Sequence, residues 1–372
     1  MQIKKTIFFL YVSTISLISA NESISLYNQK QTIYLYSDNN VRYKNLESTL
    51  RQFHINFEVT DTFNEENSLY IIPNIYNIDQ EQLPKYYIAY QTLDLEKNLL
   101  TESYLLKLAN AVAVWDYSRH NIDLYKSQIY NYYYLPNNYE HADPVILPCF
   151  LPISALDTYK ALLIYSNHDD TEISSLIPVL FFHSFIQNPK LIVEAGVCLG
   201  YSTQSFQQVN KLTHSLLIGI DNDPNAIPAY SNIYNGTFAL INDLDFPEYY
   251  RKSDFKDTPI DIVFIDTSHE YTHTLAEIQQ FVPLLSANGI IMFHDSYVTP
   301  LIVDGRRAFW RLNNTIQLAC ENPFGVAPAI KDYFGISFDE SAYTNKIFTR
   351  DGLSWHMIHY PFCNGLTILK KI

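Results

Sequence analysis

The sequence is poor in charge and lacks the cysteine pattern of several common protein classes. Only 17% of its residues are charged and 47% are hydrophobic, a balance that predicts packed globular domains rather than a disordered chain. Its four cysteines are widely spaced and form no C-x-x-C pair, so neither a disulfide framework nor a zinc site is predicted. The formal net charge of −14 argues against binding to a nucleic acid backbone.

Two glycine-rich motifs that hold phosphate groups are also missing. Neither the dinucleotide fingerprint G-x-G-x-x-G nor the phosphate-binding pattern G-x-x-x-x-G-K-[ST] occurs in the chain. The first absence disfavours an NAD-linked oxidoreductase.

The amino-terminal residues are typical of a secretory signal peptide. Lys4 and Lys5 precede the apolar run Thr6–Ala20, which ends in small residues before a polar segment. The run is short for a membrane span, and no other stretch of the sequence is long and apolar enough for one. We therefore predict that residues 1–20 are a signal peptide and that the protein is exported. The alternatives are a cytoplasmic protein and an uncleaved anchor, which would be its only membrane contact.

The segment Leu191–Thr203, LIVEAGVCLGYST, predicts a strand, a turn with two glycines and the start of a helix. The apolar run Leu191–Val193 is typical of a strand covered on both faces of a parallel sheet. Gly196 and Gly200 allow backbone conformations and close approaches that other residues do not. A strand, a glycine turn and a helix in this order bind nucleotide-like ligands in open α/β sheets. A purely structural turn in an unrelated α/β domain is the alternative.

Side chains around this turn indicate the charge of its ligand. Glu194 would repel a pyrophosphate and suits a cationic ligand, such as an amino acid ammonium beside a sulfonium. Ser202 and Thr203 are predicted to cap the following helix, whose free N–H groups point back over the turn. Cys198 is predicted to be a small packing residue rather than a nucleophile.

Acidic residues end five predicted strands of the second half of the chain. Ligands of doubly wound sheets bind at the edge formed by the carboxyl ends of the strands, where we expect these side chains to meet. Asp221, the acid that ends the second of these strands, can accept hydrogen bonds from a ribose diol. A helix N-cap is the alternative role for Asp221 and for Asp243. The five acids are Glu194, Asp221, Asp243, Asp266 and Asp295.

The first half of the chain predicts a smaller α/β domain over residues 31–150, because candidate strands alternate with helices, including one at His120–Ile129. The segments Tyr87–Gln91, Ala113–Asn121 and Tyr134–Pro136 resemble the acceptor-side lobe of two-lobed glycosyltransferases. The resemblance implies a glycosyltransferase-like accessory domain. It implies no transferase activity, since those enzymes carry the sugar nucleotide mainly on a second lobe, which is missing here.

A proline-marked linker, with Pro144, Pro148 and Pro152, separates this domain from a second one predicted over residues 155–372. Strands and helices alternate in the second domain as far as the last acid, which indicates a parallel sheet. A helix is expected from Tyr271 to Ser286, stopped near Asn288–Gly289. Further on, Ser354–Tyr360 and Gly365–Lys370 predict a β-hairpin, and 298–322 and 323–349 predict loops that bind the substrate.

Four motifs of the second domain carry a second resemblance. They are E-A-G-x-x-x-G-Y-S-T from Glu194, D-T-S-H-x-Y from Asp266, L-L-x-x-x-G-I-I-x-F-H-D from Leu284 and N-G-L from Asn364, together with Asp221. With them the domain resembles class I S-adenosylmethionine-dependent methyltransferases. More narrowly, it is similar to the metal-dependent O-methyltransferases related to macrocin O-methyltransferase and the cephalosporin-biosynthesis methyltransferases. The implied fold is a Rossmann-like methyltransferase sheet, parallel with a C-terminal antiparallel hairpin, preceded by the smaller α/β domain.

The resemblance also implies a cofactor, S-adenosylmethionine, and its contacts. The glycine turn would surround the methionine part, the second acid would hold the ribose, and Asn242 or Asp243 would face the adenine. The cofactor-binding residues expected on this basis are Glu194, Gly196, Gly200, Tyr201, Ser202, Asp221, Asn242, Asp243 and Asp266.

Methyl transfer to a hydroxyl group requires a base, and a divalent cation assists it by lowering the pKa of the hydroxyl. Asp266 and Asp295 end strands expected to be neighbours and offer the oxygen ligands that Mg²⁺ prefers. Ser296 is a third, weaker candidate ligand. His269, three residues after the first aspartate, is the candidate base. His294 is predicted to point to the opposite side of its strand from Asp295 and therefore not to be a ligand.

These observations predict O-methylation of a hydroxyl on a small molecule or saccharide by an enzyme that uses S-adenosylmethionine and Mg²⁺. Nucleic acid is excluded as a partner, and a homo-oligomer is compatible with the sequence. The alternative is a non-catalytic binding protein on the same scaffold. Export favours this alternative, because S-adenosylmethionine is made in the cytosol.

Overall fold

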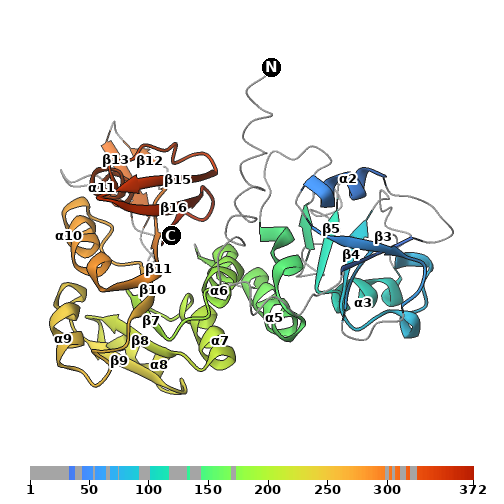
Figure 1. The fold of residues 1–372 in the computed structure, drawn as a ribbon, viewed down its shortest axis with the longest axis horizontal. Coiled ribbons are helices and arrows are strands. Elements are labelled where there is room, and N and C mark those ends of the chain that lie inside the picture. Colours follow the sequence, from blue (N-terminus) through green and yellow to red (C-terminus); the bar gives the residue numbers. More distant parts are fainter. Residues whose placement is uncertain are drawn as a thin grey trace. The chain divides into compact units, whose positions relative to one another are not determined.

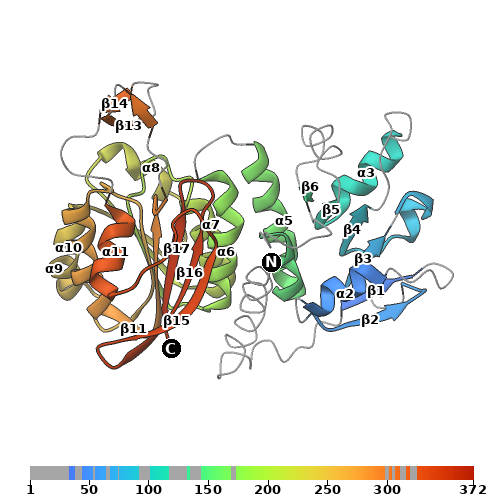
Figure 2. The same cartoon turned by 90° about the horizontal axis from the view of Figure 1, so that it is seen from above.

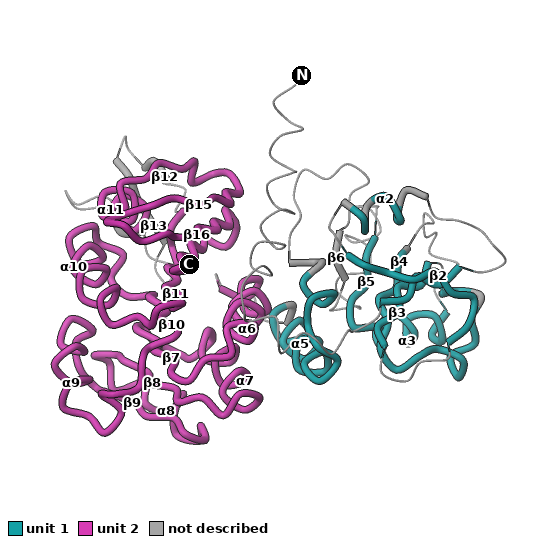
Figure 3. Tube along the Cα trace, in the orientation of Figure 1, with its two compact units in different colours: residues 1–170 teal, residues 171–372 magenta. Residues whose placement is uncertain are grey.

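The computed structural model divides the chain into two compact units, residues 1–170 and residues 171–372 (Figure 3). It describes residues 33–37, 44–52, 55–63, 68–73, 75–91, 101–116, 132–134, 144–168, 173–297, 301–303, 306–310, 316–318 and 325–372. The predicted signal peptide, the predicted helix His120–Ile129 and most of the predicted loop 298–322 lie outside these ranges. Within these ranges, no helix has both the length and the apolar character needed to cross a membrane.

The first unit is built on a six-stranded parallel sheet with the strand order β2-β1-β3-β4-β5-β6 (Figure 2). The strands alternate with helices along the chain, as predicted, because a parallel neighbour needs a crossover connection. The strands are β1 (Ile33–Tyr36), β2 (Phe57–Thr60), β3 (Leu69–Pro73), β4 (Tyr87–Gln91), β5 (Ala113–Asp116) and β6 (Tyr132–Tyr134). The helices are α2 (Lys44–Gln52), α3 (Glu102–Asn110) and α5 (Ile153–His168).

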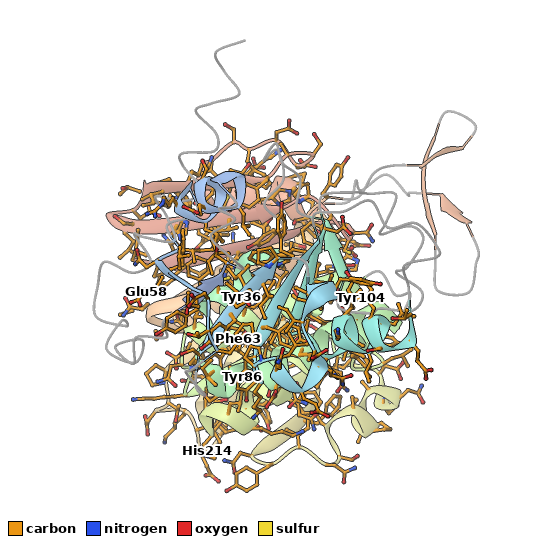
Figure 4. The ribbon with its side chains drawn as sticks, turned by 90° about the vertical axis from the view of Figure 1, so that its right-hand side faces the viewer. Tyr36, Glu58, Phe63, Tyr86, Tyr104 and His214 are labelled. Atoms are coloured by element: carbon orange, nitrogen blue, oxygen red, sulfur yellow. The ribbon has the colours of Figure 1, made fainter. Side chains whose placement is uncertain are left out.

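Aromatic rings fill much of the core on one side of this sheet. Tyr36 stacks on Phe63 with the ring centres 4.4 Å apart, and Phe63 meets Tyr70 edge to face (Figure 4). Tyr104 of α3 is buried against the same cluster of core residues. The high tyrosine and phenylalanine content of the sequence therefore serves, in this unit, to build a core.

The second unit contains an eight-stranded mixed sheet with the order β15-β16-β17-β11-β10-β7-β8-β9 (Figure 1). Its five strands from β7 to β11 are parallel. The last three strands of the chain continue the sheet beyond β11, and each of them runs antiparallel to its neighbours. The strands are β7 (Leu191–Ala195), β8 (Leu216–Asp221), β9 (Gly236–Leu240), β10 (Ile260–Ile265), β11 (Leu285–His294), β15 (Thr344–Arg350), β16 (Leu353–Tyr360) and β17 (Leu366–Lys371). A separate three-stranded sheet consists of β12 (Leu301–Val303), β13 (Arg306–Trp310) and β14 (Ile316–Leu318). The predicted fold class is confirmed.

Helices cover both faces of the eight-stranded sheet (Figure 2). On one face Phe246, Phe281 and Phe334, each from a different helix, join a single core with alternate residues of β7, β10 and β11. On the other face Phe206 of α7 lies 5.3 Å, between ring centres, from Phe264 of β10. Burial on both faces explains why the central strands are apolar without alternation. The helices are α6 (Ile177–Ile186), α7 (Thr203–Thr213), α8 (Ile227–Tyr230), α9 (Phe246–Lys252), α10 (Tyr271–Phe281) and α11 (Val326–Phe334).

Several elements were not predicted from the sequence. The described parts of 298–322, expected as a loop, form the strands β12, β13 and β14. The segment 323–349, expected as a substrate loop, forms α11 and the edge strand β15, so the antiparallel part has three strands instead of a hairpin alone. Helix α9 is short and begins Phe-Pro, and a helix of seven residues shows little periodicity.

The expected helix stop at Asn288–Gly289 is wrong. Helix α10 ends at Phe281, and both residues belong to β11, where the pairing with β10 is irregular. Ile260 pairs with Leu285 whereas Ile262 pairs with Ile290, so extra residues bulge out of β11. A glycine inside a strand commonly marks such a bulge, and that is its role here.

The boundary between the two units follows α5, which the sequence analysis assigned to the second domain. In the structure this helix belongs to the first unit. The Asp157 carboxylate of α5 accepts a hydrogen bond from the hydroxyl of Tyr86, at the start of β4, over 3.0 Å.

Two buried histidines lie on one side of the antiparallel strands of the second unit. The ring of His183 in α6 is hydrogen-bonded to the Tyr360 hydroxyl of β16 at 2.9 Å, and His356 to the Asn345 side chain at 2.8 Å. Burial lowers the pKa of His183 to about 3 and that of His356 to about 4. Both rings are therefore neutral in the folded protein across the physiological range.

We expect these two histidines to make the second unit unstable in acid. An unfolded histidine binds a proton below about pH 6.5, whereas the folded ones do not. Their contribution is therefore complete above pH 6.5 and is lost as the pH falls toward 4, with a slope approaching about 2.7 kcal/mol per pH unit for two protons. His183→Gln keeps a hydrogen-bonding group for Tyr360 and should halve this slope. Hydrogen exchange of the β16 and β17 amides in the full chain, followed from pH 7 to pH 4, measures this slope of the unfolding free energy with pH.

The exposed His214 provides the matched control. It has a left-handed backbone at the end of α7, which asparagine tolerates, so His214→Asn should leave the slope unchanged. Equal slopes for the wild type and His183→Gln would contradict the assignment.

Candidate functional site

The glycine turn after β7 is fixed by its contacts with neighbouring strands. Gly196 has a φ of +84°, and a Cβ atom there would overlap the Asp266 carbonyl at the end of β10. Gly200 has a φ of +80°, and a Cβ atom there would be 2.6 Å from Ala229 Cβ. Both glycines are therefore required, for conformation and for close approach, as the sequence predicted.

The Glu194 carboxylate is completely buried and holds the turn together. It accepts hydrogen bonds from the Ser202 hydroxyl at 2.5 Å, the Tyr230 hydroxyl at 2.6 Å and the Thr203 hydroxyl at 2.9 Å. Burial raises its pKa to about 7 despite these three donors. A carboxylate bonded in this way fixes the turn from inside the fold, and its expected contact with a cationic ligand stays a prediction.

The predicted helix cap by Ser202 and Thr203 is wrong. Ser202 occupies the N-cap position of α7, but its side chain makes no capping hydrogen bond. Its backbone is helical, with φ −61° and ψ −35°, whereas a capping residue is normally extended. Both hydroxyls instead donate to the buried carboxylate, an acceptor stronger than a neutral one. Of the expected cofactor contacts in this turn, Ser202 is buried and Tyr201 is half-buried.

Asp221 ends β8 and orients the backbone of the glycine turn. Its Oδ2 atom accepts from the N–H groups of Val197 at 2.9 Å and Cys198 at 2.8 Å, and Oδ1 accepts from Asp223 N–H at 2.8 Å. The predicted packing role of Cys198 is wrong, because its side chain is exposed and its backbone makes the contact. A carboxylate has about four acceptor positions, so Asp221 retains capacity for another donor.

The pair that was expected to face adenine is split between two environments. Asn242 is exposed, and its side chain accepts a hydrogen bond from Leu244 N–H at 3.0 Å. Asp243 is buried and lies 2.7 Å from Nε2 of His273 on α10. Glu277, one turn further along α10, is completely buried, accepts from Thr267 at 2.7 Å, and has a pKa raised to about 9 by burial. Because the Glu277 carboxyl is neutral at physiological pH, it can lie beside the Asp243 carboxylate without charge repulsion.

The carboxyl ends of β10 and β11 bring two aspartates and two histidines together. Nε2 of His269 lies 3.0 Å from Asp266 Oδ1 and 3.2 Å from Asp295 Oδ2. Nδ1 of His294 lies 3.2 Å from Asp266 Oδ1 and 3.5 Å from Asp295 Oδ1. Both His269 and Asp295 have left-handed backbones, with φ of 59° and 52°, which is sparsely populated for such residues.

The prediction that His294 points away from Asp295 is wrong. It assumed that side chains alternate along an extended strand. Strand β11 ends at His294, and the left-handed backbone of the next residue turns the Asp295 side chain toward the same place. The alternation therefore does not extend to this pair.

The four groups at this edge strongly influence one another. Burial alone would raise the pKa of Asp266, but His294 and His269 hold it well below its usual range. Burial alone would lower the pKa of both histidines. The charges of Asp266 and Asp295 instead raise that of His294 to about 9 and that of His269 above its usual value.

A divalent cation fits the chemistry of these residues. Asp295 Oδ1 is buried and accepts no hydrogen bond from the described part of the chain, which is costly for a carboxylate oxygen. Asp266, His294 and Asp295 place three possible ligand atoms within 4.8 Å of one another. Ser296, the third ligand expected from the sequence, is buried, and its hydroxyl accepts a hydrogen bond from Thr367 at 2.9 Å.

The turn between β16 and β17 contacts the residues at the carboxyl end of β11. The Cys363 carbonyl lies 3.0 Å from Nε2 of His294, and the Asn364 carbonyl accepts from Tyr297 N–H at 2.6 Å. Gly365 has a φ of +87°, and a Cβ atom there would overlap the backbone of Tyr297. The C-terminal N-G-L motif thus belongs to the site, although it is far from it in the sequence.

Comparison with known proteins assigns the region that contains these motifs. Residues 193–296 match the family model described as a methyltransferase domain. No curated protein matches the chain in a sequence comparison.

The chain is also similar to solved methyltransferase structures at low identity. It shares 13% identity with the SAH-bound Podospora anserina methyltransferase PaMTH1, covering 60% of this chain and 89% of that one with a TM-score of 0.35. It shares 16% identity with the Bacillus cereus O-methyltransferase in complex with SAH, covering 58% and 91% with a TM-score of 0.36. For the SAM-bound O-methyltransferase TomG from Streptomyces achromogenes, identity is 11%, coverage is 52% and 78%, and the TM-score is 0.34.

Sequence reasoning missed several residues of the candidate site in the second unit. His273 and Glu277 are four residues apart on α10, a spacing that puts both on one helix face. That spacing alone could have indicated them. Tyr230 and Cys363 gave no such signal, because only the fold brings them to Glu194 and His294.

The raised pKa of Glu194 predicts how its charge affects stability. Because the folded pKa of about 7 exceeds the usual unfolded value, its stabilising contribution is present at acid pH and is lost as the pH rises from about 4.5 to 7. Glu194→Gln removes this titration. The variant should gain about 3 kcal/mol relative to the wild type between pH 4.5 and pH 8, as measured by urea unfolding.

The control for this experiment is Glu248→Gln, since Glu248 is exposed on α9. Its stability difference from the wild type should stay nearly constant over the same pH range. If the stability difference between Glu194→Gln and the wild type also stayed constant with pH, the Glu194 carboxyl would not titrate in this range.

Proposed function

We propose that the protein is an S-adenosylmethionine-dependent O-methyltransferase assisted by a divalent cation. The observation that carries this proposal is the position of His269 between the carboxylates of Asp266 and Asp295, at the edge of a methyltransferase domain. Removing a proton from a hydroxyl group is the task that such a histidine performs in O-methylation. The proposed acceptor is a hydroxyl of a small molecule or a saccharide.

The cofactor is proposed to lie over the glycine turn. Gly196 and Gly200 let the turn pack closely against Asp266 and Ala229, which sets the shape of the turn over which the methionine part would lie. Asp221, with unused acceptor capacity, lies at the end of β8 where a ribose diol would be held. Asn242, exposed after β9, is the candidate contact for adenine. Glu194 contributes indirectly, because its three hydrogen bonds hold the turn in shape.

The reaction follows from the proton-accepting group and the charges beside it. The acceptor oxygen attacks the methyl carbon as the carbon–sulfur bond breaks and its electron pair returns to sulfur, which leaves S-adenosylhomocysteine. His269 takes the proton of the acceptor hydroxyl, and the imidazolium formed is stabilised by Asp266 and Asp295. A divalent cation bound by the two aspartates would polarise the acceptor oxygen and lower its pKa.

The first unit is proposed to be a glycosyltransferase-like accessory domain. Its six parallel strands support this proposal, since alternating strands and helices on a parallel sheet suit such a lobe. An exported protein remains the proposal for its location.

The cofactor assignment predicts a specific loss of affinity. Asp221→Ala removes the ribose contact and should weaken S-adenosylmethionine binding by about 1–3 kcal/mol, or about 5- to 150-fold. Isothermal titration calorimetry on the full chain measures it. The matched control is Asp261→Ala, because Asp261 also accepts a backbone N–H, from Lys190 at 2.7 Å, but lies at the start of β10 at the opposite edge. Unchanged affinity in a folded Asp221→Ala variant would refute the pocket.

The catalytic assignment predicts that two variants fail differently. His269→Ala should keep cofactor and metal affinity but lose about 10²- to 10⁴-fold in rate, the usual contribution of a general base. Asp295→Asn should weaken metal binding, and excess metal should restore part of its rate. Transfer of labelled methyl groups from S-adenosylmethionine to a panel of catechols, phenols and free sugars measures the rate.

The exposed-histidine variant His214→Asn serves as the control and should match the wild type. If His269→Ala turns over normally and a chelator has no effect, the assignments of both base and metal are wrong. Saturable cofactor binding without transfer to any acceptor would favour a binding protein on the same scaffold.

A further inference from the structure

His294 presents a nitrogen atom to the two aspartates at a spacing suited to a shared cation. Its Nδ1 lies 3.2 Å from Asp266 Oδ1 and 3.5 Å from Asp295 Oδ1. Two ligands about 2.1 Å from one cation, separated by the tetrahedral angle, lie about 3.4 Å apart. The observed separations bracket that value, so the three atoms are arranged as a ligand set.

The orientation of the His294 ring is fixed by the opposite nitrogen. Nε2 lies 3.0 Å from the Cys363 carbonyl, which can only accept, so Nε2 carries the hydrogen. In the neutral ring, the lone pair is then on Nδ1 and faces the carboxylates. Histidine ligands of metals are commonly oriented by such a bond to a backbone carbonyl. The ring is also buried, with 4% of its surface exposed, so it cannot easily turn away.

The oxygen atoms opposite this ring support the same arrangement. Asp295 Oδ1 is buried and accepts no hydrogen bond from the described residues. Oxygen and nitrogen lone pairs that converge in a buried place need a cation or a proton between them. The Ser296 hydroxyl already accepts a hydrogen bond from Thr367 on the neighbouring strand, which makes it a weaker candidate for the third position than a nitrogen with no other acceptor role.

We propose that His294 is the third ligand of the divalent cation held by Asp266 and Asp295, and that it makes the site prefer a transition-metal cation to Mg²⁺. The inference rests on the proposed metal-assisted function and specifies the class of its cation. Mg²⁺ favours oxygen ligands, whereas imidazole suits Zn²⁺, Co²⁺ and the other cations of that series.

Titration of the full chain with Co²⁺ and with Mg²⁺ tests this proposal, because the visible spectrum of Co²⁺ reports a nitrogen ligand directly. The wild type should bind Co²⁺ at least tenfold more tightly than Mg²⁺. His294→Ala should lose at least tenfold in Co²⁺ affinity, change the Co²⁺ spectrum and affect Mg²⁺ much less. His294→Asn, which offers an amide oxygen, should reduce the preference for Co²⁺ in the same way and guards against a variant that does not fold.

A control variant separates this site from incidental binding. His214→Asn, at an exposed position outside the site, should bind both cations as the wild type does. Unchanged Co²⁺ affinity in both folded His294 variants, or an equal loss for both cations, would overturn the inference. If Asp295→Asn still lost metal affinity in that case, the proposed function would stand with a different third ligand. If the wild type bound neither cation, both the inference and the metal part of the proposed function would fail.

Discussion

The buried Glu194 carboxylate, with its hydrogen bonds, is the interaction on which the candidate site of the second unit depends. It lies inside β7 and accepts hydrogen bonds from hydroxyls of two segments, the start of α7 and α8. A buried carboxylate without hydrogen-bond donors would strongly destabilise the fold. Removing any one of the three hydroxyls therefore leaves part of the Glu194 charge unsatisfied. Glu194 therefore fixes the glycine turn through side-chain hydroxyls, and Asp221 fixes it through the backbone N–H groups of Val197 and Cys198.

A second constraint operates at the ends of β10 and β11. Two aspartates and two histidines lie within hydrogen-bonding or ion-pair distance, and the left-handed backbones of His269 and Asp295 aim their side chains at a common point. Strain of this kind persists only where surrounding contacts impose it. The turn after β16 supplies such contacts directly after Asp295, because the Gly365 and Asn364 carbonyls accept hydrogen bonds from the N–H groups of Ser296 and Tyr297. The geometry needed for proton removal thus depends on the last strands of the chain.

The parallel strands of the second unit could be predicted from the sequence, whereas the elements around them largely could not. Continuous apolar runs such as β7 and β10 identified buried strands, and acids such as Asp266 marked the edge where they end. The edge strand β15 was missed because half-exposed strands lack such a run, and its Thr344–Arg350 segment is mostly polar. The role of Ser202 was misjudged because its hydroxyl could either cap α7 or donate to the buried Glu194 carboxylate, and the spacing of residues does not distinguish the two.

The sequence by itself determined the fold class, the need for glycine at positions 196 and 200, and the set of acids at the carboxyl edge. Each of these follows from local chemistry: apolar periodicity, backbone freedom and the position of a charge after a strand. Only the tertiary structure decided which groups those acids contact. Glu194 meets Tyr230, Asp243 meets His273, and His294 turns toward Asp295. Such pairings depend on how separate elements pack and on where a strand ends, and neither is encoded in the spacing of nearby residues.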